Sequence, residues 1–203
     1  MATIEYFYAA HSAFAYLGSA RLMEIVKASG ATLLHRPMDL RRVVPASGSS
    51  PTSQRSAGHR AYFFGREIQR WSEERNAPVV QGLPTHHAND IDLPNCMLIA
   101  AGESGDAVDR LAHAILQAHW RDDADHADPA TLERLANGLG LDGKALLAAA
   151  GTDAVKAKYE QYTEDAIARS VFGSPTYVVD GDMFYGQDRL EMVERALRQP
   201  YRR

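Results

Sequence analysis

The chain has 203 residues, a formal net charge of −4 and 45% hydrophobic residues. That apolar content suffices for a sizeable core, and the pI of about 6.0 lacks the basic character typical of nucleic-acid-binding proteins. No apolar run approaches the roughly 20 residues of a membrane span and no signal peptide is evident, so we expect a cytoplasmic protein without membrane or nucleic-acid partners. The one cysteine, Cys96, excludes an internal disulfide and a cysteine-based zinc site.

The N-terminal segment predicts a β–α–β unit. Residues 4–8 are mostly β-branched or aromatic, which is typical of a buried strand. A helix follows over residues 13–29, with Ser12 as a suitable N-terminal cap and Gly30 as a stop. Residues 32–36 then predict a second short strand. A unit of this kind normally makes parallel strands through a right-handed crossover.

The middle of the chain is predominantly helical in pattern. Residues 43–56 are rich in Ser, Pro and Gly and predict a loop long enough to be functional. A continuous helical pattern covers residues 57–76, and an irregular stretch follows. Further helices are predicted over 94–102, 107–120 and 129–138, and after caps at Asp142 and Thr152.

The C-terminal segment returns to strands, over residues 176–180 and 183–185, and closes with a helix over 187–197. Neither end of the chain can bury a sheet face by itself. We therefore expect an α/β fold in which both ends build one sheet on the thioredoxin-like plan, βαβ…ββα. The thioredoxin-like domain is expected to be discontinuous, over 1–40 and 160–203, and interrupted by a large all-helical insertion over 41–159.

The start of the first helix lacks the sulfur atoms that redox proteins of this plan carry. They have Cys-x-x-Cys there, because a helix N-terminus stabilises a thiolate. Here residues 12–15 read Ser-Ala-Phe-Ala, which excludes dithiol exchange. The Ser174-Pro175 pair before a strand predicts a cis peptide bond beside which a thiol peptide can pair. With Ser12 at the helix start, the thiol would be borrowed, and glutathione is the obvious supplier.

Three blocks of sequence resemble the bacterial 2-hydroxychromene-2-carboxylate isomerases, relatives of the kappa-class glutathione transferases. Residues 9–17 share a Ser, an aromatic residue, Tyr and Leu with the family's opening motif. Residues 69–71 (Gln-Arg-Trp) match a segment of the inserted helices, and Asn95 matches the start of the next one. Residues 171–190 are similar to the family's Val-Phe-Gly-Val-Pro-Thr and Gly-Asn-Asp-Arg-Leu segments. The departures are Ala9, Ala13 and Gln187, where the family has Asp, Pro and Asn.

The resemblance implies a glutathione site with Ser12 as the catalytic residue that bonds the sulfur. The cysteinyl backbone of glutathione would pair beside Pro175, and its γ-glutamyl end would meet the start of the last helix. The nearest match to a family lysine is Arg60. The glutathione-binding residues implied in this way are Ser12, Arg60, Ser174, Pro175, Gln187 and Asp188. Residues assigned to the second substrate are His11 and Asn95.

The implied activity is a cis–trans isomerisation that interconverts 2-hydroxychromene-2-carboxylate and trans-o-hydroxybenzylidenepyruvate, or a close analogue. Glutathione would add its thiolate to a conjugated α-keto acid and leave again after rotation, so it is a catalytic cofactor. The expected partners are glutathione and a small aromatic or chromene acid, and the expected assembly is a homodimer. Two alternatives stay open: a glutathione transferase and a non-catalytic thioredoxin-like binding module.

Purely structural interpretations compete with several of these roles. Ser12 also fits as a helix cap, Asp188 as a charge that complements the helix dipole, and Arg60 as a solvated residue. The histidines near 86–92 and 119–126 lack the spacing of a known metal motif, so we predict solvated loop residues and no metal site. We expect core or interface positions for Trp71, Trp120 and Cys96.

Overall fold

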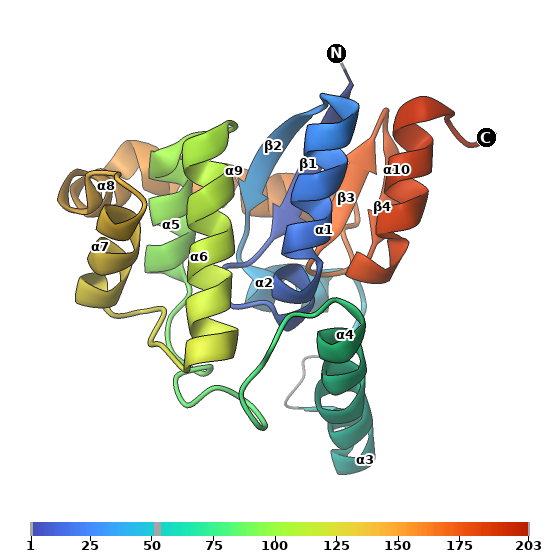
Figure 1. Cartoon of the computed structure of the whole chain (residues 1–203), viewed down its shortest axis with the longest axis horizontal. Helices are drawn as coiled ribbons and strands as arrows, with labels where there is room; N and C mark the ends of the chain where they lie inside the picture. The colour runs from blue at the N-terminus through green and yellow to red at the C-terminus, as the bar shows by residue number, and fades with distance from the viewer. Residues whose placement is uncertain (1, 51–53, 203) are drawn as a thin grey trace.

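The computed structural model describes residues 2–50 and 54–202, in which both ends of the chain build one sheet (Figure 1). The sheet has the strand order β2-β1-β3-β4. Its strands are β1 (Thr3–Tyr8), β2 (Thr32–Pro37), β3 (Thr176–Val179) and β4 (Asp182–Tyr185). β1 pairs in parallel with β2 and antiparallel with β3, which pairs antiparallel with β4. The predicted thioredoxin-like α/β fold is confirmed.

Helices cover both faces of the sheet. Helix α1 (Ala13–Ser29) and helix α10 (Leu190–Arg198), which follows the short turn η3 (Gln187–Arg189), lie on one face (Figure 1). Because side chains alternate along a strand, Ile4 and Tyr6 of β1 join the core on that face. Phe7 points the other way and packs with Val43 of helix α2 (Leu40–Ala46) and Ala166 of helix α9 (Asp153–Ala168).

The remaining helices come from the middle of the chain and form two groups. Helices α5 to α8 lie beside the sheet, where α6 packs on α1 and α5 packs on β2 (Figure 1). The segment from α3 to α4 projects beyond the N-terminal end of α1 (Figure 1). Among the described residues no helix combines the length and apolarity of a membrane span. The bounds are α3 (Ala57–Arg60), η2 (Ala61–Glu67), α4 (Ile68–Glu74), α5 (Asp92–Ala101), α6 (Asp106–Asp122), α7 (Pro129–Gly138) and α8 (Gly143–Ala150).

Two predictions for the middle of the chain were wrong in part. The expected loop over 43–56 begins inside α2, which Asp39 caps by accepting a hydrogen bond from the backbone of Arg41 at 2.9 Å. Tertiary ion pairs from Arg42 to Glu160 and Glu164 of α9 support this short helix, and no local sequence pattern shows them. Residues 51–53 of the expected loop lie outside the described residues.

The second difference is in the helix expected over 57–76, which is not uniform. Its central part, η2, is π-helical over Ala61–Glu67. A π-turn widens the helix and shifts the direction of the side chains that follow, and such turns are frequent at functional sites. Here the turn places the neighbouring Phe63 and Phe64 in two different cavities, which are described below.

Helix α1 approaches the C-terminal half of the fold unusually closely at Gly18. A Cβ atom at this position would lie 2.6 Å from the Cβ of Gln187 and 3.2 Å from Cδ1 of Leu190. The absence of a side chain therefore lets η3 dock directly on α1, and this docking fixes the position of Gln187.

We predict that Gly18→Ala destabilises the protein. The added methyl would force η3 away from α1, at a cost of about 1–3 kcal/mol that exceeds the roughly 1 kcal/mol gained in helix propensity. Urea unfolding measures the difference. Gly58→Ala is the matched control, because a Cβ there meets nothing within 4 Å. Equal stability of Gly18→Ala and the unmodified protein would contradict the proposed close docking.

Candidate active site

Ser12 lies at the junction between β1 and α1, where the two halves of the fold meet. Its extended backbone and its hydroxyl, which accepts a hydrogen bond from the backbone of Ala15 at 3.3 Å, confirm the predicted cap. The same hydroxyl donates to the carbonyl of Ser174 at 3.2 Å. That carbonyl belongs to the Ser174-Pro175 peptide bond, which is cis as predicted. Ser12 thus caps α1 and also contacts the second landmark of the site.

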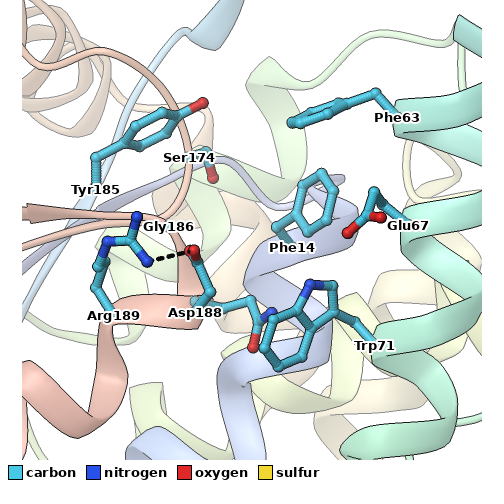
Figure 2. Close-up of a pocket in the computed structure, with 10 residues that line it drawn as sticks. Phe14, Phe63, Glu67, Trp71, Ser174, Tyr185, Gly186, Asp188 and Arg189 are labelled. Atoms are coloured by element: carbon cyan, nitrogen blue, oxygen red, sulfur yellow. Dashed lines mark hydrogen bonds and ion pairs between the residues drawn. The ribbon is translucent and has the colours of Figure 1, made fainter. Parts of the chain in front are cut away.

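A small cavity of about 230 Å³ opens beside this junction (Figure 2). Tyr185, Asp188 and Arg189 lie on one side of it, and Phe63, Glu67 and Trp71 lie on the other, with Phe14 of α1 between them (Figure 2). Ser174 also lines it. Trp71 packs against the core, as expected, but it also forms part of this cavity wall.

Gln187 and Asp188, the residues expected to bind the γ-glutamyl end of glutathione, both line the small cavity. Gln187 is almost fully buried, and its Oε1 accepts a hydrogen bond from Nε of Arg75 at 3.0 Å. Its Nε2 is buried and has no hydrogen-bond partner among the described residues. Asp188 is half exposed and forms an ion pair with Arg189 at 2.6 Å. The wall therefore offers an amide donor, a carboxylate and a guanidinium within three consecutive residues.

Arg60 and Asn95 lie elsewhere. Arg60 is exposed, donates a hydrogen bond to the carbonyl of Arg55, and lines a second cavity instead of the small one. The Oδ1 of buried Asn95 accepts from the backbone of Ala10 at 2.9 Å, and its Nδ2 donates to the hydroxyl of Tyr159 at 3.2 Å. These bonds occupy the Asn95 amide, which holds the segment before Ser12 in place.

The second cavity is larger, about 780 Å³, and His11 forms part of its wall. Most of the lining is apolar, from Leu40, Val44 and Phe64 among others. Arg41 and Arg60 also line it, and their guanidinium groups donate to backbone carbonyls, that of Arg41 to Ala88 and Asn89 and that of Arg60 to Arg55. A largely apolar cavity with two cations suits an anion with an apolar body.

The prediction that the two histidine groups are solvated loop residues was wrong for three of the four. His119 and His126 are 0% and 2% exposed, and His87 is only partly exposed. They gather against His11, whose ring centroid lies 5.0 Å from that of His87. His86 remains the more exposed member, 3.5 Å from Asp125. Among the described residues no group of three or more acidic, Cys or His side chains has metal-binding geometry.

A helical pattern within α6 could have indicated the burial of His119. Its buried positions Val108, Leu111 and Ile115 recur at spacings of three and four, and His119 continues that face. The approach of His11 and His87 could not be found in this way, because they come from distant segments that only the fold brings together.

The comparisons with known proteins agree with this architecture. The family model of the DSBA-like thioredoxin domain matches residues 3–198. This chain belongs to the DSBA-like thioredoxin domain family. It is 27% identical over 195 residues to a 2-hydroxychromene-2-carboxylate isomerase of Sphingobium xenophagum. This match covers 96% of this chain and 97% of that protein. A second isomerase of that name, from Pseudomonas putida, is 26% identical over 96% of this chain and 93% of its own length.

Solved structures of DSBA-like proteins show the same likeness. The selenomethionine structure of a 2-hydroxychromene-2-carboxylate isomerase matches with a TM-score of 0.81 and 26% identity, over 97% of this chain and 95% of that one. The cytosolic disulfide reductase DsbM of Pseudomonas aeruginosa, in its structure with GSH, matches with a TM-score of 0.61 over 98% of this chain and 93% of that one. At 19% identity the DsbM likeness concerns the fold alone. The resemblance to the isomerase family, first stated from sequence motifs, is confirmed.

Within this DSBA-like fold the histidine cluster is uncharged at neutral pH. Burial, followed by repulsion from His87 and the other rings, lowers the pKa of His11 well below its usual 6.5. Burial likewise lowers the pKa of His87 to about 4 and that of His126 to about 4. The wall of the larger cavity therefore presents neutral imidazoles beside permanently charged arginines.

We predict that this cluster makes the protein acid-labile. The unfolded chain binds protons at these histidines near pH 6.5, whereas the folded state does so only near pH 4, so stability falls as the pH drops through that window. Each such histidine contributes a slope of about 1.4 kcal/mol per pH unit. Urea unfolding between pH 7 and 4.5 should give a smaller slope for His126→Asn. His59→Asn, at an exposed position, should keep the original slope, and an unchanged slope in His126→Asn would contradict the assignment.

Proposed function

We propose that this protein is a glutathione-dependent isomerase of a carboxylated aromatic substrate, interconverting 2-hydroxychromene-2-carboxylate and trans-o-hydroxybenzylidenepyruvate or a close analogue. The observation that carries the proposal is the contact of the Ser12 hydroxyl with the Ser174-Pro175 peptide, at a helix start that has no thiol of its own. The names of the relatives support an isomerase reaction.

The chain's own thiol is unsuited to the reaction. Cys96 is buried in α5 and lines neither of the two cavities. Burial, and secondarily the nearby carboxylate of Asp92, raises the pKa of the Cys96 thiol to about 11. Since a thiolate is the reactive form, a thiol-dependent reaction here needs a thiol from outside the chain.

Groups of the small cavity would complement glutathione. The amide of Gln187 would suit a carboxylate, and the carboxylate of Asp188, which pairs with Arg189, would suit an ammonium group. The backbone beside Pro175 suits the cysteinyl peptide groups. When bound, glutathione would supply a nucleophilic thiolate for addition to a conjugated double bond and elimination from it.

Ser12 would lower the free energy of the charged sulfur. Its hydroxyl, which donates to the carbonyl of Ser174, would donate to the sulfur instead when glutathione is bound. The N–H groups at the start of α1 would add a favourable helix dipole. The larger cavity would hold the second substrate, with its carboxylate on Arg41 and Arg60 and its ring against apolar side chains such as Phe64. The two binding regions would meet near Ser12, which lines neither cavity itself but bonds to Ser174 of the small cavity wall and follows His11 of the larger one.

A turnover count with limiting glutathione tests the function. We expect many molecules of trans-o-hydroxybenzylidenepyruvate converted per molecule of glutathione, followed by the absorbance of the conjugated keto acid. One glutathione consumed per product would instead identify a transferase. Absence of glutathione binding in calorimetry would leave a non-catalytic binding module. Either of the last two results would overturn the proposal.

We predict that Ser12→Ala lowers kcat/KM by about tenfold to a thousandfold, the range for one positioned donor. The loss of the cap should reduce stability by only about 1 kcal/mol. Thr152→Ala is the matched control, because Thr152 caps α9 through the same kind of bond, to the backbone of Val155. Both variants should lose similar stability in thermal unfolding, and Ser12→Ala alone should lose activity. Unchanged kinetics in Ser12→Ala would show that Ser12 caps α1 and has no catalytic role.

We also predict that activity disappears when glutathione is removed by gel filtration and returns when it is added back. Cys96→Ala should keep its turnover within about twofold, because the buried thiol lies outside both cavities, although the truncation costs stability. Rate measurements with and without added glutathione check both statements. Full activity of the glutathione-free protein would contradict the borrowed-thiol mechanism.

A further inference from the structure

His11 is held rigidly at the boundary of the larger cavity with one ring nitrogen unused. Its side chain is 8% exposed, and its Nδ1 is buried without a hydrogen-bond partner. The indole N–H of Trp120 donates to its backbone carbonyl at 2.9 Å, which fixes the residue from the other side. A buried nitrogen that has no partner among the described residues costs free energy, and the ring that carries it also lines the larger cavity, where a ligand can contact it.

The rings behind His11 form a hydrogen-bonded chain whose tautomers follow from its end. Nδ1 of His119 lies 3.1 Å from the carbonyl of Ala124, which can only accept, and 3.2 Å from Nδ1 of His126. We assign the His119 proton to Nδ1 on the basis of the carbonyl, and with this assignment its Nε2 accepts from Nδ1 of His87, 3.0 Å away. Neutral His87 therefore keeps a lone pair on Nε2, and its ring also lines the larger cavity.

We propose that His11 is a further catalytic residue, which exchanges a proton with the hydroxyl oxygens of the bound substrate, and that His87 is a positioning residue whose ring packs beside that of His11. The proposal rests on the isomerase function above. It assigns the ring opening and closing of the chromene to the chain itself, separate from the double-bond rotation that needs the thiol.

The step balances without a further reactant. The proton of the hemiketal hydroxyl moves to a ring nitrogen of neutral His11, and the O–H electron pair forms the ketone. The carbon–oxygen bond of the ring breaks, and its electron pair goes to the aryl oxygen. His11 then gives its proton to that oxygen, which becomes the phenol, so the residue returns to its neutral form.

The charges around His11 keep its imidazole unprotonated as long as the cavity holds no anion. It faces His87 from the loop after α4, Arg41 from α2, His119 from the end of α6, and His126 from the next loop. Asp125 and His86 lie farther out and pair with each other. All the groups facing His11 are neutral or positive, which keeps its proton off. A carboxylate entering the cavity offsets this repulsion and raises the pKa of His11, so anion binding should be coupled to proton uptake.

Kinetics with His11→Asn give the first test. We expect kcat to fall about 100-fold, within the range for a lost general acid–base, with glutathione affinity within about twofold. His87→Gln should lose less and shift the pH profile of kcat. His113→Asn is the matched control, because His113 is a partly buried histidine bonded to Ser19 at 2.7 Å and lines neither cavity. A His11→Asn variant that binds glutathione and keeps kcat within about twofold would overturn the proposal.

A binding experiment without turnover gives the second test. Cinnamate, a planar aromatic acid, is titrated calorimetrically into the protein near pH 6 in two buffers of different ionisation enthalpy. We expect proton uptake with the unmodified protein and with His113→Asn, and a clear reduction of it in His11→Asn. Equal proton uptake in His11→Asn, or no binding of cinnamate, would overturn the proposal. Since cinnamate binding requires no glutathione, this result is independent of whether the isomerase proposal holds.

Discussion

The segment between β1 and α1, residues 9–12, is the feature on which the site depends. It is buried and irregular, so its backbone groups need partners from elsewhere in the fold. The side chain of Ser174 accepts from the backbone of Ala9 at 3.1 Å, Asn95 accepts from that of Ala10, and Trp120 donates to the carbonyl of His11. These partners come from the C-terminal part of the sheet and from α5 and α6. The inserted helices are thereby part of the machinery that positions Ser12.

Two cavities of different chemistry lie close to this segment: His11 lines the larger one, and Ser174, which bonds to Ser12, lines the small one. The small one carries a carboxylate, a guanidinium and a free amide donor, whereas the larger one is mostly apolar with two arginines and neutral histidines. The π-helical turn η2 contributes a phenylalanine to each of them. A regular helix would turn successive residues through about 100°, and the wider turn changes which neighbours face inward. Under the proposed function, the two cavities would hold a peptide-like thiol and an aromatic acid apart, on either side of residues 9–12.

Electrostatics links the larger cavity to stability. Burying four imidazoles together keeps them neutral, which costs stability as the pH falls, since the unfolded chain takes up protons more readily. A carboxylate bound in the cavity would favour the protonated form of these rings and so oppose part of this loss.

The sequence by itself determined the parts that rest on local chemistry and on short motifs. The strands at both ends, the caps at Ser12, Asp128, Asp142 and Thr152, and the cis bond before Pro175 all follow from residues close together in the chain. The absence of any thiol at the start of α1 excluded dithiol chemistry in the same way. The motif grouped Gln187 and Asp188 as binding residues, and both line the small cavity.

Only the tertiary structure decided what lies opposite these residues. Arg60 lines the larger cavity and not the small one. The Asn95 amide accepts a hydrogen bond from the backbone of Ala10, and His119 and His126 are buried close to His11. The local sequence pattern predicted neither helix α2 nor the π-helical turn η2. Long-range ion pairs stabilise α2, and η2 packs between the two cavities. Side chains from distant segments determine burial, and burial determines both the charge of a histidine and its access to a ligand.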